Sequence, residues 1–555
     1  MNKKVCSFPI LFALLALLIG TCAVVFPASA QAAPTSTGSI TVSGTVASSY
    51  DAYQIFSADV VDGDSDAKIA TDLAWASDAA RDAVLPVLHS AGMPNSQTTA
   101  QEAAEWLNAD SHLTSALSAQ LARSLQSSDA VPVPLNAGTA AKLSCGYWLI
   151  VADDDVIAQN EAGTAPIMAL VGGAAVTVKP KAATPKVAKH VLEDSTAAWQ
   201  KAADATVADD LYWRLSATVP AGLTAYDAYT VQFVDTMSAG LDPSKVAASM
   251  RVYVAAGADG GFDAVKTGKD GRAGTEPAKG WTDITAQCAT KVTADGTFTV
   301  RTGDLIAALG GADAFAAGAR VVAVYNAPLN SACSHGIAKG NPNEVYLRYP
   351  RSPFADQSGD AGFTRTPSDD ACAYTWDLAL TKRGSDGDKP LAGAVLSIAD
   401  DRGRTLAADG TWDEEGKATV TTGEDGRVTV SGVDSGKLEV RELKAPKGYT
   451  AFEGTRSVTV KAEGLDVDQV AAAKPKLTIT AESPLRADSA DGSTGSLEAS
   501  LINTPTGTPP SITTGGFMPS TGDMAMYAAA AAAVAGAALI VVALLVKRGG
   551  GSHKE

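Results

Sequence analysis

Residues 440–449 read VRELKAPKGY, a run of alternating apolar and polar side chains that closes in a turn containing proline and glycine. Side chains at every second position of a strand share one face of the sheet. Glu442 therefore shares its face with Leu438 and Val440, and that face is apolar. A carboxylate buried without partners is costly. The sequence thus predicts a β-sandwich whose core holds Glu442 together with polar partners from elsewhere in the chain.

Two such partners lie at the two ends of the same unit. Lys382 alternates with the leucines of its strand (LALTK, 378–382), and Asn503 alternates with those of the last strand (LEASLIN, 497–503). Burial raises the pKa of a carboxyl group and lowers that of an amine. A neutral lysine amine can attack the Asn amide carbon, while a protonated Glu442 assists the loss of ammonia. The alternative is an inert sandwich with a surface lysine, a surface glutamate and a turn asparagine.

These segments, together with PLAGA at 390–394, resemble the collagen-adhesin B-type (Cna B-type) domain of pilins. The hallmark of that family is the box E-T-x-A-P-x-G-Y, in which this chain has Leu443 for threonine. The resemblance implies that Lys382 and Asn503 join through an intramolecular isopeptide bond, with Glu442 promoting the reaction.

The preceding unit resembles a fimbrial isopeptide-forming domain in three segments. These are its opening strand (TPKVAKHV, 184–191), its D-T-L-x-x-G-L segment (FVDTMSAGL, 233–241) and its G-N-x-N-x-V-Y-L-x-Y strand (GNPNEVYLRY, 340–349). After that last tyrosine the family often has S-N-N-P, where this chain has PRSP.

This second resemblance implies a bond between Lys189 and Asn343, promoted by Asp235. Alternation supports the choice, because each of the three shares a face with apolar neighbours in its strand. Asn341 has the same parity as Asn343 but stands before a proline at the edge of the strand, so it is the second choice. The alternative is a sandwich without a crosslink.

Both ends of the chain carry targeting signals. Lys3 and Lys4, an apolar run and the small-residue stretch PASA (27–30) predict a secretory signal peptide. The apolar run 524–546 is long enough to cross a bilayer and is followed by basic residues. Before this run stands a pentapeptide that resembles the L-P-x-T-G sorting signal read by sortases. Its residues are Met518, Pro519, Ser520, Thr521 and Gly522.

By this resemblance, a sortase cuts between Thr521 and Gly522 and joins Thr521 to an amine. The segment VTVKPKA (176–182) resembles the pilin motif V-x-V-Y-P-K-N, which aligns Lys181 with the acceptor lysine. Lys179 and Ala182 replace the tyrosine and asparagine of that motif. The alternative is a stiff polybasic linker.

The fold class expected is mainly β, with tandem immunoglobulin-like (Cna A/B-type) sandwiches and helices inserted in the first domain. Thr99 and Glu102 form a capping-box signature for one of these helices. The layout expected is a signal peptide at 1–32, an N-terminal pilin domain at 33–178, a hinge at 179–186, a middle domain at 187–377, a Cna B-type domain at 378–505, a stalk at 506–517 and a sorting signal at 518–555 with a transmembrane helix at 524–546.

Composition narrows the function. The net charge of −17 argues against nucleic acid as a partner, since phosphates need a basic surface. We expect no cofactor and no metal. The sequence has no H-E-x-x-H pair, G-x-S-x-G elbow or P-loop, so it does not predict an enzyme. Four cysteines follow the signal peptide, and three disulfide connectivities are open to them: Cys145, Cys288, Cys333 and Cys372.

The function expected is that of a shaft subunit in a cell-wall-anchored fimbrium, possessing isopeptide crosslinks and supporting adhesion. Its expected partners are pilus-specific and housekeeping sortases, identical subunits and peptidoglycan. The membrane retains it only transiently through the C-terminal helix. The alternative is a monomeric, wall-anchored adhesin that does not polymerise.

Overall fold

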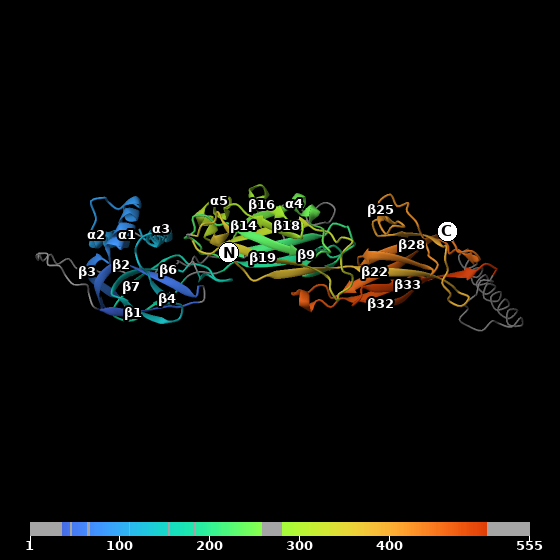
Figure 1. Cartoon of the computed structure of the whole chain (residues 1–555). Helices are drawn as coiled ribbons and strands as arrows, with labels where there is room; N and C mark the ends of the chain where they lie inside the picture. The colour runs from blue at the N-terminus through green and yellow to red at the C-terminus, as the bar shows by residue number, and fades with distance from the viewer. Residues whose placement is uncertain are drawn as a thin grey trace, which may run out of the picture.

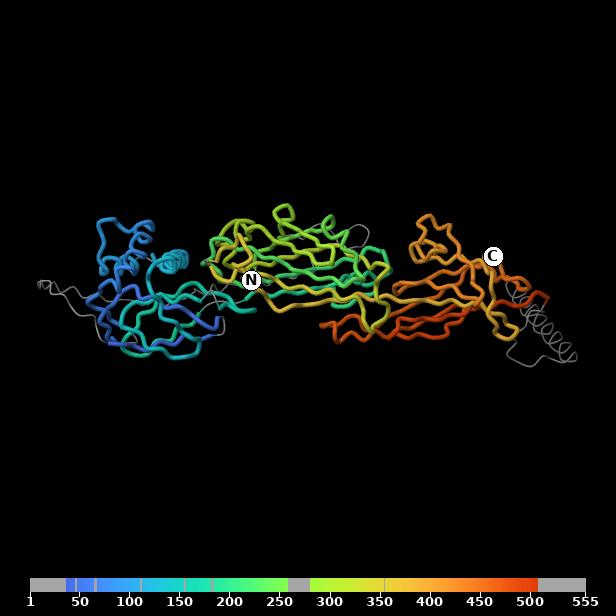
Figure 2. Tube along the Cα trace, in the orientation of Figure 1, coloured from blue at the N-terminus to red at the C-terminus, as the bar shows by residue number. Residues whose placement is uncertain are grey.

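The computed structural model describes residues 36–507, with gaps at 45–46, 64–66, 110–111, 154–155, 181–183, 258–279 and 354. The expected signal peptide, Lys181, the sorting signal and the apolar run 524–546 lie outside the described residues. Within the described ranges, no helix is long and apolar enough to span a membrane. The chain forms three bodies that follow one another in a row and give an elongated molecule (Figures 1 and 2). The prediction of a mainly β chain of tandem sandwiches is confirmed.

The first body contains a five-stranded sheet, a small three-stranded sheet and three helices. Its strands are β1 (Thr37–Val42), β2 (Ser49–Asp62), β3 (Lys68–Trp75), β4 (Val133–Asn136), β5 (Ala140–Ser144), β6 (Gly146–Ala152), β7 (Ile167–Val171) and β8 (Val176–Val178). Its helices are α1 (Asp78–Ser90), α2 (Ala100–Asn108) and α3 (Ser115–Gln126). Thr99 and Glu102 form the predicted capping box of α2.

Strand β6 explains this arrangement, because its sequence GYWLIVA is apolar almost throughout. Leu149 and Val151 face a core that they share with α1, α2 and α3, whereas Trp148 and Ile150 face the small sheet. A strand covered on both faces needs a continuous apolar run rather than an alternating one. The helices therefore close one face of the main sheet, as Figure 1 shows.

The middle body is a sandwich of two sheets, of six and seven strands. The six-stranded sheet has the order β10-β9-β12-β18-β14-β15, and the other has the order β11-β21-β19-β13-β17-β16, with β20 on β19. Its strands are β9 (Lys186–Glu193), β10 (Ala198–Gln200), β11 (Ala202–Asp204), β12 (Tyr212–Val219), β13 (Gln232–Met237), β14 (Arg251–Ala256), β15 (Thr282–Asp283), β16 (Ala289–Val292), β17 (Thr297–Arg301), β18 (Ala319–Asn326), β19 (Asn341–Pro350), β20 (Phe363–Arg365) and β21 (Asp369–Tyr374). Short helices are α4 (Val246–Ser249), α5 (Leu305–Ala308) and α6 (Ala312–Phe315).

The third body is also a two-sheet sandwich, with sheet orders β27-β22-β33-β29 (plus β32) and β25-β24-β23-β28-β30-β31 (plus β26). Its first and last strands, β22 and β33, lie side by side and run parallel. Its strands are β22 (Trp376–Gly384), β23 (Val395–Ala399), β24 (Thr405–Leu406), β25 (Trp412–Asp413), β26 (Val420–Thr421), β27 (Arg427–Val433), β28 (Gly436–Lys444), β29 (Tyr449–Thr450), β30 (Thr455–Glu463), β31 (Lys476–Ala481), β32 (Leu485–Asp491) and β33 (Ser496–Pro505).

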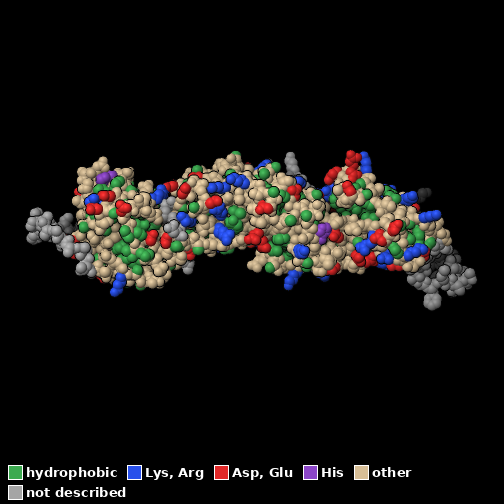
Figure 3. Space-filling view, in the orientation of Figure 1, with side chains coloured by type: hydrophobic (Ala, Val, Ile, Leu, Met, Phe, Trp, Pro, Cys, Tyr) green, Lys and Arg blue, Asp and Glu red, His purple; other side chains and the backbone are tan. Residues whose placement is uncertain are grey.

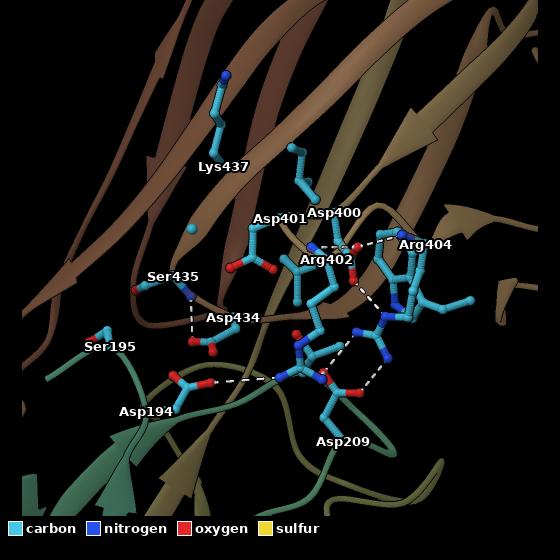
Figure 4. A pocket seen from close by; sticks show the side chains of 15 residues that line it. Asp194, Ser195, Asp209, Asp400, Asp401, Arg402, Arg404, Asp434, Ser435 and Lys437 are labelled. Carbon is cyan, nitrogen blue, oxygen red and sulfur yellow. Dashed lines mark hydrogen bonds and ion pairs between the residues drawn. The ribbon is translucent and has the colours of Figure 1, made fainter. Parts of the chain in front are cut away.

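The middle and third bodies are joined closely. Only Thr375 separates β21 from β22, and Arg404 donates two hydrogen bonds to Asp209 at 2.6 and 2.8 Å and one to Asp400 at 2.7 Å. Asp209, Asp400 and Arg404 line a cavity of about 150 Å³ between the two bodies (Figure 4). Acidic and basic side chains are interspersed along the face of the molecule seen in Figure 3.

Carboxyl groups gather beside this cavity: Glu193, Asp194, Asp204 and Asp434. Asp204 is held in place by Trp376, whose Nε1 donates to it at 2.7 Å. Burial, reinforced by Asp204, raises the pKa of Glu193 to about 7. Burial likewise raises the pKa of Asp434 well above its ordinary value. Glu193, Asp194 and Asp434 at this interface therefore hold protons more tightly than they would in the unfolded chain.

We expect this interface to lose stability as the pH rises from about 4.5, the ordinary pKa of glutamate, to about 7. Over this range the folded state binds more protons than the unfolded state, so deprotonation favours unfolding. Thermal unfolding of wild type and Glu193→Gln at pH 5 and pH 8 measures the effect. The variant should lose less stability between the two values. Glu498→Gln, an exposed control, should behave as wild type, and parallel losses in all three would contradict the prediction.

Candidate functional site

In the third body, three polar side chains meet within the core: Lys382 of β22, Glu442 of β28 and Asn503 of β33. Their exposed fractions are 0%, 6% and 2%, as their alternation with apolar residues predicts. Lys382 Nζ lies 3.2 Å from Glu442 Oε1 and donates to Asn503 Oδ1. Asn503 Nδ2 donates to both carboxylate oxygens of Glu442, at 2.9 and 3.0 Å.

The strand register brings these groups together. Lys382 lies opposite Leu501 in the parallel pair β22–β33, which places Asn503 two residues further along the neighbouring strand. Glu442 enters from the opposite sheet. Its orientation is fixed by the amide of Phe452, which donates to Glu442 Oε2 at 3.1 Å. The site therefore spans the sandwich and links its first and last strands.

The electrostatics of this site favour nucleophilic chemistry at lysine. Burial lowers the pKa of Lys382 to about 8, although the Glu442 carboxylate opposes the shift. A larger share of the amine is therefore neutral at physiological pH than in an exposed lysine. The amine of Lys382 contacts the Asn503 amide, and the Glu442 carboxyl group is hydrogen-bonded to the amide nitrogen. This arrangement can transfer the acyl group of Asn503 to the lysine and release ammonia.

The middle body holds a second buried set: Lys189 of β9, Asp235 of β13 and Asn343 of β19, each 0% exposed. Lys189 Nζ forms an ion pair with Asp235 Oδ2 and donates to Tyr325 Oη at 2.9 Å. Asn343 Nδ2 donates to the same Tyr325 oxygen at 2.8 Å. Tyr325 Oη in turn donates to Asp235 Oδ2 at 3.2 Å. The tyrosine thus connects the lysine, the acid and the amide.

Burial also shifts the pKa values of this set. It lowers the pKa of Lys189 to about 8, against the opposing effect of Asp235, and raises the pKa of Asp235 to about 6. Each shift favours the neutral form, a free amine and a protonated carboxyl group. The buried Asn343 Oδ1 accepts no hydrogen bond from the described residues, so it is open to a proton donor.

Asn341, the second choice, lies in a different environment. Its Oδ1 accepts from the amide of Ser334 at 2.8 Å, and its Nδ2 donates to the carbonyl groups of Ser334 at 2.9 Å and Ala373 at 3.1 Å. These bonds hold the loop before β19 against the sheet. The side chain of Asn341 is therefore occupied in structure, whereas that of Asn343 contacts the hydroxyl group that also binds Lys189.

Tyr325 is the member that the sequence analysis missed. It lies in β18, where nearly every side chain is buried, so alternation does not distinguish it from its neighbours. The acceptor candidate Lys181 lies outside the described residues, between the exposed Lys179 and Lys186. Of the four cysteines, Cys145 and Cys372 are buried and Cys288 and Cys333 are half-buried, and all four are free thiols.

The third body is similar to a known family of protein domains. Residues 377–474 match the family model described as "SpaA: Prealbumin-like fold domain". This match covers the strand of Lys382 and the box of Glu442, so the third body is similar to that family over both segments.

Among curated proteins, the "Trypsin-resistant surface T6 protein" of Streptococcus pyogenes serotype M6 is 28% identical to this chain over 143 residues. The match covers 24% of this chain and 24% of the relative, so the chain spans about a quarter of the length of the curated relative it matches. Among solved structures, the T6 backbone pilin of S. pyogenes is similar with a TM-score of 0.48 and 16% identity, covering 86% of this chain and all of that one. The major pilin SpaD of Corynebacterium diphtheriae has a TM-score of 0.41 and 14% identity, covering 85% and 98%.

Proposed function

We propose that this chain is the shaft subunit of a pilus that sortases assemble and attach to the cell wall. The observation that carries the proposal is the buried Lys382–Glu442–Asn503 site, which links the first and last strands of a prealbumin-like domain. The rod of three bodies supports it, since an elongated subunit gives a long filament from few copies. The sorting signal at 518–522 and Lys181 supply the two ends of each link.

The joining step is an acyl transfer between subunits. Sortase forms an acyl-enzyme at Thr521, releasing Gly522, and the Lys181 amine of the next subunit displaces the enzyme to form an amide. Head and tail contacts of this kind differ from each other and do not close on themselves, so they generate an open filament. The final subunit is transferred to an amine of peptidoglycan instead. The pilus then displays the chain outside the cell, where it supports adhesion.

Within each subunit, we propose two isopeptide bonds, Lys382–Asn503 and Lys189–Asn343. In each, the lysine nitrogen forms a bond to the amide carbon and one ammonia leaves. Glu442 and Asp235 carry the protons, and Tyr325 holds the second set in register. Each site reacts once and consumes its own side chains, so the protein has a structural role and is not an enzyme.

The two asparagines of β19 give a sharp test of the middle bond. We expect Asn343→Ala to lose one ammonia fewer than wild type, because the amide that reacts is gone. Asn341→Ala is the matched control and should still lose that ammonia, since the Asn341 side chain bonds to Ser334 and Ala373 rather than to Tyr325. Intact-mass spectrometry, with peptide mapping of Lys189, makes the measurement. If Lys189 is still crosslinked in Asn343→Ala, Asn343 is not the residue that forms the bond.

A denaturing gel of wall extract, probed with antibody to this chain, tests the proposed function as a whole. A covalent polymer survives denaturation, so a pilus subunit gives a ladder of high-mass bands. A single band at the mass of one subunit would instead identify a monomeric wall-anchored adhesin, since the same sorting signal serves both.

A further inference from the structure

A half-buried thiol at the junction of the middle and third bodies lies next to an imidazole and a carboxylate. Cys333 Sγ is 3.5 Å from His335 Nε2, and His335 Nδ1 is 2.8 Å from Asp377 Oδ2. The second contact is close, but it is not aligned as a hydrogen bond. Side-chain exposure is 25% for His335 and 32% for Asp377, so the group borders solvent. The three residues follow the order nucleophile, base and orienting acid that activates cysteine and serine side chains.

The two bodies together hold this arrangement. Cys333 and His335 lie in the loop before β19, and Gly336 N of that loop donates to Thr375 O at 3.1 Å while Ile337 N donates to Gly492 O at 3.1 Å. A Cβ atom on Gly336 would lie 2.5 Å from the backbone nitrogen of Gly495, so only glycine permits this approach. The loop of the middle body is therefore seated on the third body.

Asp377, at the start of β22, is fixed separately. Its Oδ1 accepts from Ser431 Oγ at 2.6 Å and from Gly432 N at 3.1 Å, which leaves Oδ2 for the imidazole. The carboxylate is thus oriented toward His335 by the third body, while the imidazole is positioned by the loop of the middle body. The group is complete only when the two bodies are docked.

The thiol is not a resting thiolate. Burial, and then the negative charge of Asp377, raise the pKa of Cys333. Reaction therefore needs His335 to accept the proton as the sulfur attacks, and Asp377 to stabilise the imidazolium that forms. Cys288 is also half-buried, but its sulfur donates to the carbonyl oxygen of Ile284 at 3.3 Å, and burial raises its pKa to about 11.

The surroundings of Cys333 favour attack on a disulfide over attack on a carbonyl group. An acyl intermediate needs backbone amides free to bind an oxyanion. The amides of Cys333 and Ser334 already donate to Asn330 O at 3.1 Å and Asn341 Oδ1 at 2.8 Å. Displacement at sulfur forms no oxyanion and needs only a base. Cys333 and Cys372 are separate free thiols: Cys372 belongs to the core cluster of the third body, whereas Cys333 packs against that of the middle body.

We propose that Cys333 is a thiol–disulfide exchange site that captures small disulfides outside the cell, with His335 as its base and Asp377 as the positioning residue. Cys333 sulfur bonds to one sulfur of the disulfide, and the original S–S bond breaks. The other half leaves as a thiolate and takes up the proton that His335 accepted. Cys333 is oxidised to the mixed disulfide, and one thiol is released for each disulfide reduced.

The test is the reaction of the full chain with a dipyridyl disulfide, followed by the absorbance of the released thiopyridone and by peptide mass mapping. We expect Cys333 to react about tenfold or more faster than Cys288, since a positioned general base contributes on the order of a hundredfold in enzymes. Cys333→Ser should remove this fast phase, and Cys288→Ser should leave it unchanged. His335→Gln should slow the fast phase by about tenfold.

The pH profile separates a base from a merely structural residue. Asp377 is the carboxylate that faces both reacting groups. In wild type the pH–rate profile should reach a plateau set by the general base, whereas in His335→Gln the rate should keep rising as the thiol itself ionises. Asp377→Asn should give an intermediate rate with unchanged melting. Equal reactivity of Cys333 and Cys288 in wild type would overturn the proposal whatever the variants do, and so would an unaltered profile in His335→Gln.

Discussion

Lys382→Ala is expected to lower the melting temperature of the third body by on the order of 20 °C. The proposed bond closes a loop between residues 121 positions apart. By analogy with a disulfide, such a closure restricts the unfolded chain by about 5 kcal/mol. Each kcal/mol moves the melting temperature of a domain of this size by about 4 °C. Differential scanning calorimetry of the full chain, with reductant present, measures the shift.

Two control variants test whether the bond is responsible for this shift in melting temperature. Lys389→Ala removes an exposed lysine of the same body, whose side chain is 56% exposed, and should melt as wild type. Glu442→Ala keeps Lys382 but should not form the bond of the third body. Its mass should therefore show one ammonia lost fewer than in wild type. If peptide mapping of wild type shows Lys382 and Asn503 unjoined, the bond does not form, and any change in melting then reports only the loss of the buried lysine beside Glu442.

Lys181→Ala should abolish the high-mass ladder while the monomer still reaches the wall through Thr521. Lys181 lies between Pro180 and Pro185, and the residue before each proline is held in an extended conformation. An amine on such a segment can reach the acyl-enzyme formed on another subunit. Lys189 cannot, because it is fully buried. Immunoblots of wall extracts from the two strains make the comparison.

Lys179→Ala and Lys186→Ala are the matched controls, since both lysines are exposed and flank the same segment. Each should leave the ladder intact. If Lys179→Ala alone removes it, the acceptor has been assigned to the wrong lysine. A ladder that persists in all three variants would place the acceptor outside this hinge.

Strand periodicity predicted much of both buried polar sites, because a lysine or acid on an apolar face must be buried. It identified Lys382, Glu442 and Asn503 as core residues, and all three are buried. The same rule could not separate Asn343 from Asn341, since both face inward and only their contacts differ.

Other features lay beyond any local pattern. Tyr325 is hidden in a strand that is buried on both faces, where periodicity carries no information. Cys333 and His335 are neighbours in sequence, but Asp377 comes from the next body, and only the docking of the two bodies brings it to 2.8 Å from the imidazole. Such a group depends on how distant segments of the chain pack together, and strand periodicity in the sequence does not encode that packing.

The parallel pairing of β22 and β33 has a mechanical consequence. Tension enters the third body at Trp376 and leaves at Pro505. The proposed bond between Lys382 and Asn503 would carry the load from one strand to the other, and the chain between them would bear none of it. In the middle body the proposed bond would end at Asn343, so the chain from there to Tyr374 would stay under load, held by strand pairing and core packing. We therefore expect the third body to be the stiffer of the two under tension.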